Sequence, residues 1–110
     1  MNYGVKMQFD VKVPMRDGVN LSTDVYLPGA QGPFPAVLIR TPYDNNSAAM
    51  IEKGRRLANN GYACVIQDCR GRWDSDGVYY AFQNEGKDGH DTQEWIGRQA
   101  WCSGKIGTAG

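Results

Sequence analysis

The stretch "AVLIRTPYDNNSAAMIEKGRRLANNGYACVI", residues 36–66, decides the fold. It begins and ends with short apolar runs, residues 36–40 and 62–66, and neither run alternates with polar residues as a half-exposed strand does. Strands that are apolar throughout are typical of a parallel sheet covered on both faces. Residues 47–60 between them have helical spacing, with an apolar face made of Met50, Ile51, Gly54, Leu57 and Ala58. The stretch therefore predicts a strand–helix–strand unit with a right-handed crossover.

The residues before this stretch predict a β-hairpin. Residues 7–15 alternate between apolar and polar side chains, and residues 19–27 repeat the alternation. Arg16, Asp17 and Gly18 supply the turn between them, because glycine readily takes a positive φ. We expect two antiparallel strands that have one apolar face and one face in water.

The residues after it predict a second helix and a third parallel strand. A long loop rich in glycine and aspartate comes first. The helix, residues 91–99, takes Asp88 or Asp91 as its N-cap and turns Ile96 toward the core. Residues 106–109 then form a buried strand. A hairpin followed by alternating strands and helices indicates an α/β domain with a mixed sheet, and residues 1–110 make up one such domain or part of one.

The composition excludes several classes of protein. Twelve basic and twelve acidic side chains cancel, so nothing indicates the clustered basic surface that binds nucleic acid or an anionic membrane. No apolar run is long enough to span a bilayer, and the first residues lack the apolar stretch of a signal peptide. Three cysteines are too few and too irregularly spaced for a disulfide scaffold or a zinc site, and Cys64 is most simply a core residue. We expect a cytoplasmic protein.

The motifs for cofactors and metals are incomplete. The glycines near the end of the sequence do not have dinucleotide-binding spacing, and Gly104-Lys105 is followed by Ile106 rather than by the Ser or Thr of a phosphate loop. Residues 72–77, "RWDSDG", suggest a calcium loop, but arginine holds its first ligand position. We therefore expect no cofactor and no metal. His90 could pair with a cysteine on paper, yet a lone histidine at a polar helix start is typically a surface residue.

The predicted fold locates the place where chemistry would occur. In open α/β sheets, ligands bind beyond the carboxyl ends of the strands. The segments after residues 40, 66 and 109 share this rim, which carries Tyr43 and Asp44 and ends at Gly110. A short strand followed by glycine is how a nucleophile elbow begins. Asp68 and Arg70 lie at the same rim, but two such residues more often tie a loop to its neighbours through charge-assisted hydrogen bonds.

Four segments, in the same order, resemble the amino-terminal part of the X-Pro dipeptidyl-peptidase and cocaine esterase family of serine hydrolases, which also includes cephalosporin acylases and α-amino acid ester hydrolases. They are "VPMRDGVNLSTDVYLP", "PFPAVLIRTPYDN", "LANNGYACVIQDCRGRWDSDG" and "NEGKDGHDTQEWIGRQAWCSGKIG". The resemblance implies the amino-terminal half of an α/β-hydrolase fold. Its sheet order would be the hairpin, then residues 62–66, 36–40 and 106–109. The helical cap and the jelly-roll domain of the complete enzymes are absent from this chain.

The resemblance assigns roles to individual residues. Gly110 matches the first glycine of the elbow, so the serine would be the second residue after it, in a continuation x-Ser-x-x-Gly, and the acid and the histidine would follow later. Tyr43 matches the tyrosine whose hydroxyl supplies half of the oxyanion hole, which agrees with its place after the first parallel strand. The alternative role for Tyr43 is packing. A weaker assignment to the substrate pocket covers Asp44, Trp73 and Tyr79.

The resemblance implies hydrolysis of an ester or amide bond through an acyl-serine intermediate, with Tyr43 supplying part of the oxyanion hole. The substrate stays open between an X-Pro peptide, an ester and a β-lactam acyl group. The expected partners are this small substrate, the remainder of the same polypeptide, and a second copy of the chain that pairs with residues 106–109. The alternative is a non-catalytic fragment or binding domain that is inactive as it stands.

Overall fold

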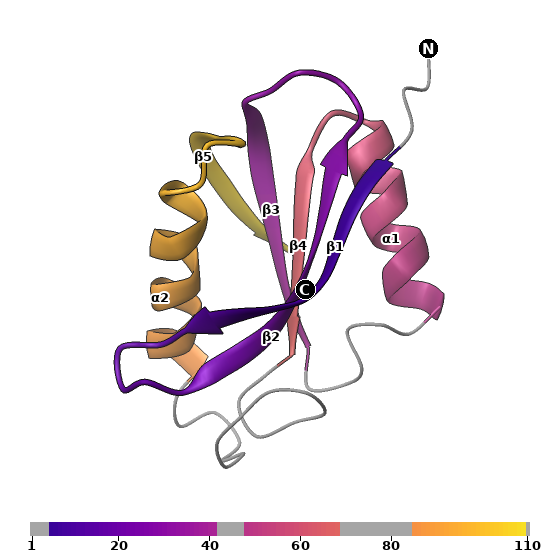
Figure 1. Cartoon of the computed structure of the whole chain (residues 1–110). Coiled ribbons are helices and arrows are strands. Elements are labelled where there is room, and N and C mark those ends of the chain that lie inside the picture. The colour runs from indigo at the N-terminus through magenta and orange to yellow at the C-terminus, as the bar shows by residue number, and fades with distance from the viewer. Residues whose placement is uncertain (1–4, 42–47, 69–84, 110) are drawn as a thin grey trace.

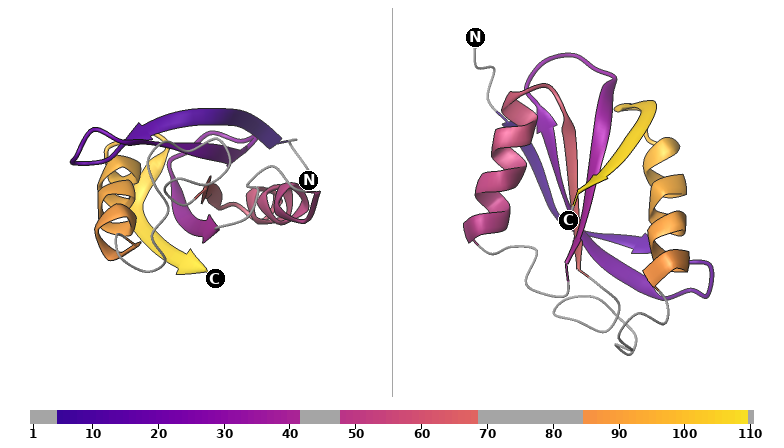
Figure 2. Two further views of the ribbon diagram at one scale, coloured as in Figure 1. Left: turned by 90° about the horizontal axis from the view of Figure 1, so that it is seen from below. Right: turned by 180° about the vertical axis from the view of Figure 1, so that it is seen from behind.

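The computed structural model describes residues 5–41, 48–68 and 85–109, which form a five-stranded mixed sheet with a helix against each face (Figures 1 and 2). In chain order the elements are β1 (Val5–Pro14), β2 (Asn20–Pro28), β3 (Phe34–Thr41), α1 (Ala48–Asn59), β4 (Ala63–Asp68), α2 (Glu85–Gly97) and β5 (Cys102–Ala109). Neither helix in this part of the chain is long and apolar enough to cross a membrane.

The sheet has the strand order β1-β2-β4-β3-β5. β1 pairs with β2 and β2 with β4 in antiparallel fashion, whereas β3 runs parallel to both β4 and β5. This confirms the predicted α/β fold and the strand order that the resemblance implied. One apolar cluster lies under α2 and includes Leu38, Val65 and Ile96, and a second lies under α1 and includes Ile39 and Ile66.

The strand–helix–strand unit forms as predicted, within one or two residues at each boundary. Gly61 has a φ of +93° and ends α1, a conformation that glycine takes without strain. Gly54 and Ala58 are buried on the face of α1 that meets the sheet. Gly54 packs against Tyr26 of β2 so closely that a Cβ atom placed there would lie 2.5 Å from the Tyr26 Cδ2 atom.

The hairpin is confirmed, but its expected solvent-exposed face is wrong for β2. Every residue of β2 from Leu21 to Pro28 is buried. β2 lies between β1 and β4, and helices cover both faces of the sheet, so its polar side chains are enclosed together with its apolar ones. Period-two alternation therefore indicated the strand correctly and its environment incorrectly.

A bulge in β1 also contradicts the single apolar face predicted for residues 7–15. The register shifts between Gln8 and Val11, and Asp10 has a φ of 54°. Before the bulge, Val5 packs into the cluster under α1, and after it Val13 packs with Leu21 on the opposite face. The extra residue thus moves the alternation to the other side of the sheet. The part of β1 before the bulge is partly exposed to solvent, and Met7 and Phe9 are exposed there.

The last two elements differ most from the sequence expectations. α2 begins at Glu85, so Asp88 and Asp91 lie inside the helix and do not cap it. Ile96 is fully buried as predicted. β5 begins at Cys102 and, contrary to expectation, is not buried: Ile106 is half-buried and the neighbouring residues are exposed. The reason is that β5 pairs with β3 on one side only and forms an edge of the described sheet.

Candidate active site

The three parallel strands end at one rim of the sheet. Thr41, the last residue of β3, pairs with Asp68, the last residue of β4. Ala109, the last residue of β5, pairs with Ile39 of β3. Because parallel strands point the same way, the segments that follow them start from a common edge, as the sequence predicted (Figure 1). This rim is the candidate active site.

The residues assigned to this site from the sequence lie outside the described residues. They are Tyr43, Asp44, Trp73, Tyr79 and Gly110. Arg70, the predicted partner of Asp68, is outside as well, whereas Asp68 itself is fully buried at the end of β4. The roles of these residues therefore stay predictions, and the described structure supplies the frame to which they are attached.

A buried polar network lies under the rim on the α2 side. Gln67 is completely enclosed and connects three elements. Its Oε1 atom accepts a hydrogen bond from Arg40 Nε on β3 at 2.8 Å and lies 2.9 Å from Thr92 Oγ1 on α2. Its Nε2 atom donates to Thr23 Oγ1 on β2 at 3.1 Å. A buried polar group without a partner costs about 1–3 kcal/mol, so these contacts fix the four side chains relative to one another.

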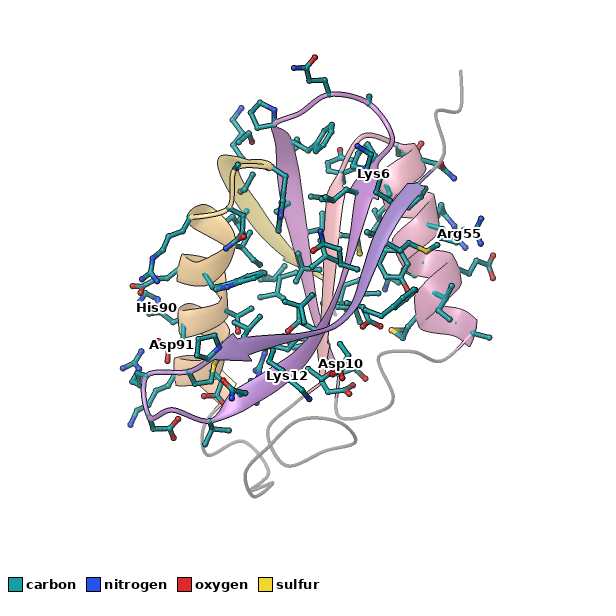
Figure 3. The ribbon with its side chains drawn as sticks, viewed as in Figure 1. Lys6, Asp10, Lys12, Arg55, His90 and Asp91 are labelled. Carbon is teal, nitrogen blue, oxygen red and sulfur yellow. The ribbon has the colours of Figure 1, made fainter. Side chains whose placement is uncertain are left out.

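A second polar cluster lies at the β1 bulge, on the face that α1 covers. The Asp10 N–H donates to Asp24 Oδ1 at 2.9 Å, and the Ser22 hydroxyl donates to Asp10 Oδ1 at 2.7 Å. Lys12 Nζ lies 3.1 Å from the same Asp10 oxygen, and Figure 3 shows these two side chains together on β1. The hydrogen bond from Ser22 is the main reason that the pKa of Asp10 is lowered. Together these contacts hold Asp10 in its left-handed conformation.

An ion pair fastens the hairpin turn to α2. Arg16 Nη2 lies 2.7 Å from Asp91 Oδ1, and Arg16 Nε lies 3.0 Å from Asp91 Oδ2. The Arg16 backbone N–H also donates to Asp91 Oδ2 at 3.0 Å. These hydrogen bonds from Arg16 lower the pKa of Asp91 to about 2. The carboxylate that the sequence suggested as a helix cap is thus engaged with a residue 75 positions away.

The structure explains two further candidates for a base and a nucleophile, His90 and Cys64. His90 is exposed on α2, and its Nε2 atom lies 2.8 Å from Glu94 Oε1, which confirms its prediction as a surface residue (Figure 3). Cys64 is fully buried, as predicted, and burial raises the pKa of its thiol to about 12, so it is not a thiolate at neutral pH. Within residues 5–41, 48–68 and 85–109, no three His, Cys, Asp or Glu side chains are grouped to hold a metal ion.

The network around Gln67 was missed in the sequence. The signal that could have indicated it is the polar Gln67-Asp68 pair at the end of the apolar run "YACVI". A polar side chain on a strand that is covered on both faces must find a buried partner. Its partners Thr23 and Thr92 come from distant segments, and local patterns do not identify them.

The chain matches known proteins along nearly its whole length. Residues 17–110 match the model of the family described as X-Pro dipeptidyl-peptidase (S15 family). The chain is 42% identical over 113 residues to a cocaine esterase of Rhodococcus sp. (strain MB1 Bresler), an alignment that covers 99% of this chain and 19% of that protein.

The chain also resembles solved structures of hydrolases along nearly its whole length. An α-amino acid ester hydrolase superimposes with a TM-score of 0.81 at 30% identity and covers 97% of this chain and 21% of its own. A CocE/NonD family hydrolase of Staphylococcus aureus gives a TM-score of 0.84 at 28% identity and covers 94% of this chain and 22% of its own. The chain thus spans about a fifth of the length of the relatives that it matches.

Proposed function

The chain belongs to the X-Pro dipeptidyl-peptidase (S15) family of hydrolases, and on this premise we propose that it is the amino-terminal part of a serine hydrolase that cleaves ester or amide bonds. The proposal includes an acyl-serine intermediate, formed by a serine that follows Gly110 and by an acid and a histidine from later in the full-length polypeptide. In this proposal residues 1–110 supply the first half of the catalytic domain and one oxyanion donor.

The observation that carries the proposal is the adjacency of β3 and β5 at the rim. β3 ends at Thr41, two residues before Tyr43, and β5 ends at Ala109, directly before Gly110. These two strands are hydrogen-bonded neighbours that run parallel. The segment with the proposed oxyanion donor and the segment with the proposed nucleophile therefore start from adjacent strands at one edge, an arrangement that an acyl-transfer site requires.

The proposed mechanism gives Tyr43 a specific task. When the serine attacks the substrate carbonyl, negative charge develops on the carbonyl oxygen. A phenol hydroxyl is a hydrogen-bond donor at neutral pH, and together with the backbone N–H after the serine it would stabilise that charge. The histidine takes the proton from the serine and returns it to the leaving group. Two relatives are esterases or ester hydrolases by name, so an ester is the first substrate to test.

The test is the substitution Tyr43→Phe in the full-length protein. Loss of one oxyanion donor lowers kcat by about 10²–10³-fold, while folding is nearly unaffected because one hydroxyl is removed. Activity is measured with a p-nitrophenyl ester, a benzoyl ester, an X-Pro peptide and a glutaryl amide. The control is Tyr62→Phe, which removes an exposed hydroxyl at the opposite end of β4 from the rim. A fall of less than about threefold for Tyr43→Phe, with stability intact, would show that Tyr43 only packs.

A further inference from the structure

We propose that Gln67 is a positioning residue, which holds the carboxyl end of β3 so that the segment with Tyr43 is correctly placed at the rim. This inference rests on the function proposed above. It starts from a residue that is fully buried and that joins β2, β3 and α2 through three side-chain contacts. Gln67 would act through Arg40 and would not itself touch the substrate.

The position of Gln67 in the sheet suits this role. Gln67 is the penultimate residue of β4, and its direct partner across the parallel pair is Arg40. Arg40 precedes Tyr43 by three residues. The hydrogen bond from Arg40 Nε to Gln67 Oε1, 2.8 Å long, therefore joins the side chains of β3 and β4 near the end of β3, three residues before the proposed oxyanion donor in the sequence.

The helix α2 gives this tie a fixed reference. Thr92 Oγ1 lies 2.9 Å from Gln67 Oε1 and 2.8 Å from the carbonyl oxygen of Asp88, one helical turn earlier. Both Thr92 and Asp88 are buried. The Arg16–Asp91 ion pair also holds α2 to the turn between β1 and β2. The end of β3 is therefore linked, through Gln67 and Thr92, to a helix that is itself held in place by the hairpin.

The chemistry of the site calls for an amide. Gln67 accepts at its oxygen, where Arg40 and Thr92 converge, and donates at its nitrogen to Thr23. Of the side chains of this length, a glutamate can accept in the same way but cannot donate to Thr23 when it is ionised, and a methionine can do neither well. Substitution by methionine should remove the hydrogen bond between Arg40 and Gln67 and allow the end of β3 to shift.

A small shift of a catalytic group has a large effect on rate. A misplacement of about 1 Å can lower the rate by about 10²-fold, because reacting groups must be held in near-attack geometry. Such a shift lowers kcat more than it raises KM when the affected contact exists mainly in the transition state. An oxyanion donor is a contact of that kind.

The experiment is a double-substitution cycle in the full-length protein with one p-nitrophenyl ester as substrate. Gln67→Met is expected to lower kcat by about 10- to 100-fold with KM changed by less than about twofold. In the Tyr43→Phe background the same substitution is expected to change kcat by less than about twofold, because the donor that Gln67 positions is already gone. Gln67→Glu, which retains the contact with Arg40, should lie between wild type and Gln67→Met.

Two further variants separate positioning from a loss of stability. Val65→Ala lies on the same face of β4, two residues earlier, in the apolar cluster with Leu38 and Ile96. It should lower the thermal midpoint without changing kcat, measured at a temperature where each variant is fully folded. If Gln67→Met does not fold, Thr92→Val takes its place in the cycle, since it removes the hydroxyl that faces Gln67 and keeps the side-chain shape.

The outcomes distinguish this inference from the proposed function. If Tyr43→Phe lowers kcat and the Gln67 substitution lowers it equally in both backgrounds, Gln67 does not act through Tyr43 and the inference is wrong. The same holds if the Gln67 substitution leaves kcat unchanged. If Tyr43→Phe itself has no effect, the proposed oxyanion role fails and the positioning role falls with it.

Discussion

Gly54 shows how a single residue couples two elements that are distant in sequence. It lies in the middle of α1, where glycine is less favourable than alanine by about 1 kcal/mol, yet it contacts the buried ring of Tyr26 on β2. Any Cβ atom at this position would overlap the ring, because the two would be 2.5 Å apart. The close approach of helix and strand thus depends on the absence of a side chain.

This contact predicts that Gly54→Ala destabilises the protein in spite of its better helix propensity. Overpacking a buried site costs about 1–3 kcal/mol, which outweighs the gain in propensity, so we expect a net loss of about 1–2 kcal/mol in the free energy of unfolding. Urea denaturation of the full-length protein measures this. The matched control is Gly89→Ala in α2, where the nearest atom would be 3.9 Å from the new Cβ, and it should be neutral or stabilising. A stabilised Gly54→Ala variant would contradict the packing described here.

At this scale the sequence identified positions but not their partners. Gly54 was placed on the buried face of its helix from spacing alone, and Cys64 in the core from its apolar neighbours. The need for glycine at position 54 could not be predicted, because Tyr26 comes from a strand 28 residues away. Gln67 was passed over for the same reason, since its three partners lie on three other elements.

At the scale of elements, the Arg16–Asp91 ion pair joins the hairpin turn to α2. Hydrogen bonds from Arg16 lower the pKa of Asp91 to about 2, from an ordinary value of 3.8. A carboxyl group whose pKa is lower in the folded state stabilises that state above its ordinary pKa, and this contribution is lost as the pH falls toward the folded-state value. The ion pair should therefore hold fully above about pH 4 and weaken between about pH 4 and pH 2.

The prediction is that Asp91→Asn lowers the thermal midpoint of the full-length protein at neutral pH, and that the difference from wild type shrinks as the pH falls through this window. Thermal melting followed by circular dichroism from pH 7 downward measures the difference. Glu52→Gln is the control, because Glu52 and Arg56 form an exposed pair on the surface of α1 and their charge should matter little. A difference for Asp91→Asn that does not change with pH would show that the carboxylate charge is not what holds the turn.

The elements that the sequence predicted best are those whose local pattern and tertiary environment agree. The apolar strands β3 and β4 and the helix between them are of this kind. β1 and α2 were predicted less well because distant contacts determine them. The bulge at Asp10 is held by Asp24 and Ser22 of β2, and the carboxylate of Asp91 binds Arg16 of the hairpin turn. The rim was predicted from strand order, whereas the residues assigned to it by resemblance await the tests described above.

At the scale of the whole molecule, the two edges of the sheet differ in their protection. β1 carries Lys6, Lys12, Pro14 and a bulge, which are features that prevent an edge strand from pairing with another chain. The register of β5 against β3 shifts between Cys102 and Ile106, where Gly104 has a φ of 97°, but the pairing is regular from Ile106 to Ala109. Lys105 is the only charged residue of the strand, and it lies before this regular part. Gly110 directly follows β5 in the sequence, and we propose that the rest of the hydrolase continues from there.

This asymmetry predicts that residues 1–110 alone associate through β5 and hydrolyse no p-nitrophenyl ester above background, since the proposed triad lies elsewhere. Light scattering measures the association. Thr108→Lys adds a charge to the exposed edge strand and should reduce it, whereas Gln8→Lys adds the same charge to β1 and should not. Supplying the remainder of the polypeptide as a separate chain should suppress the association and restore ester hydrolysis. A monomer that unfolds cooperatively would contradict the association through β5, and turnover that persists through purification would place the nucleophile within these 110 residues.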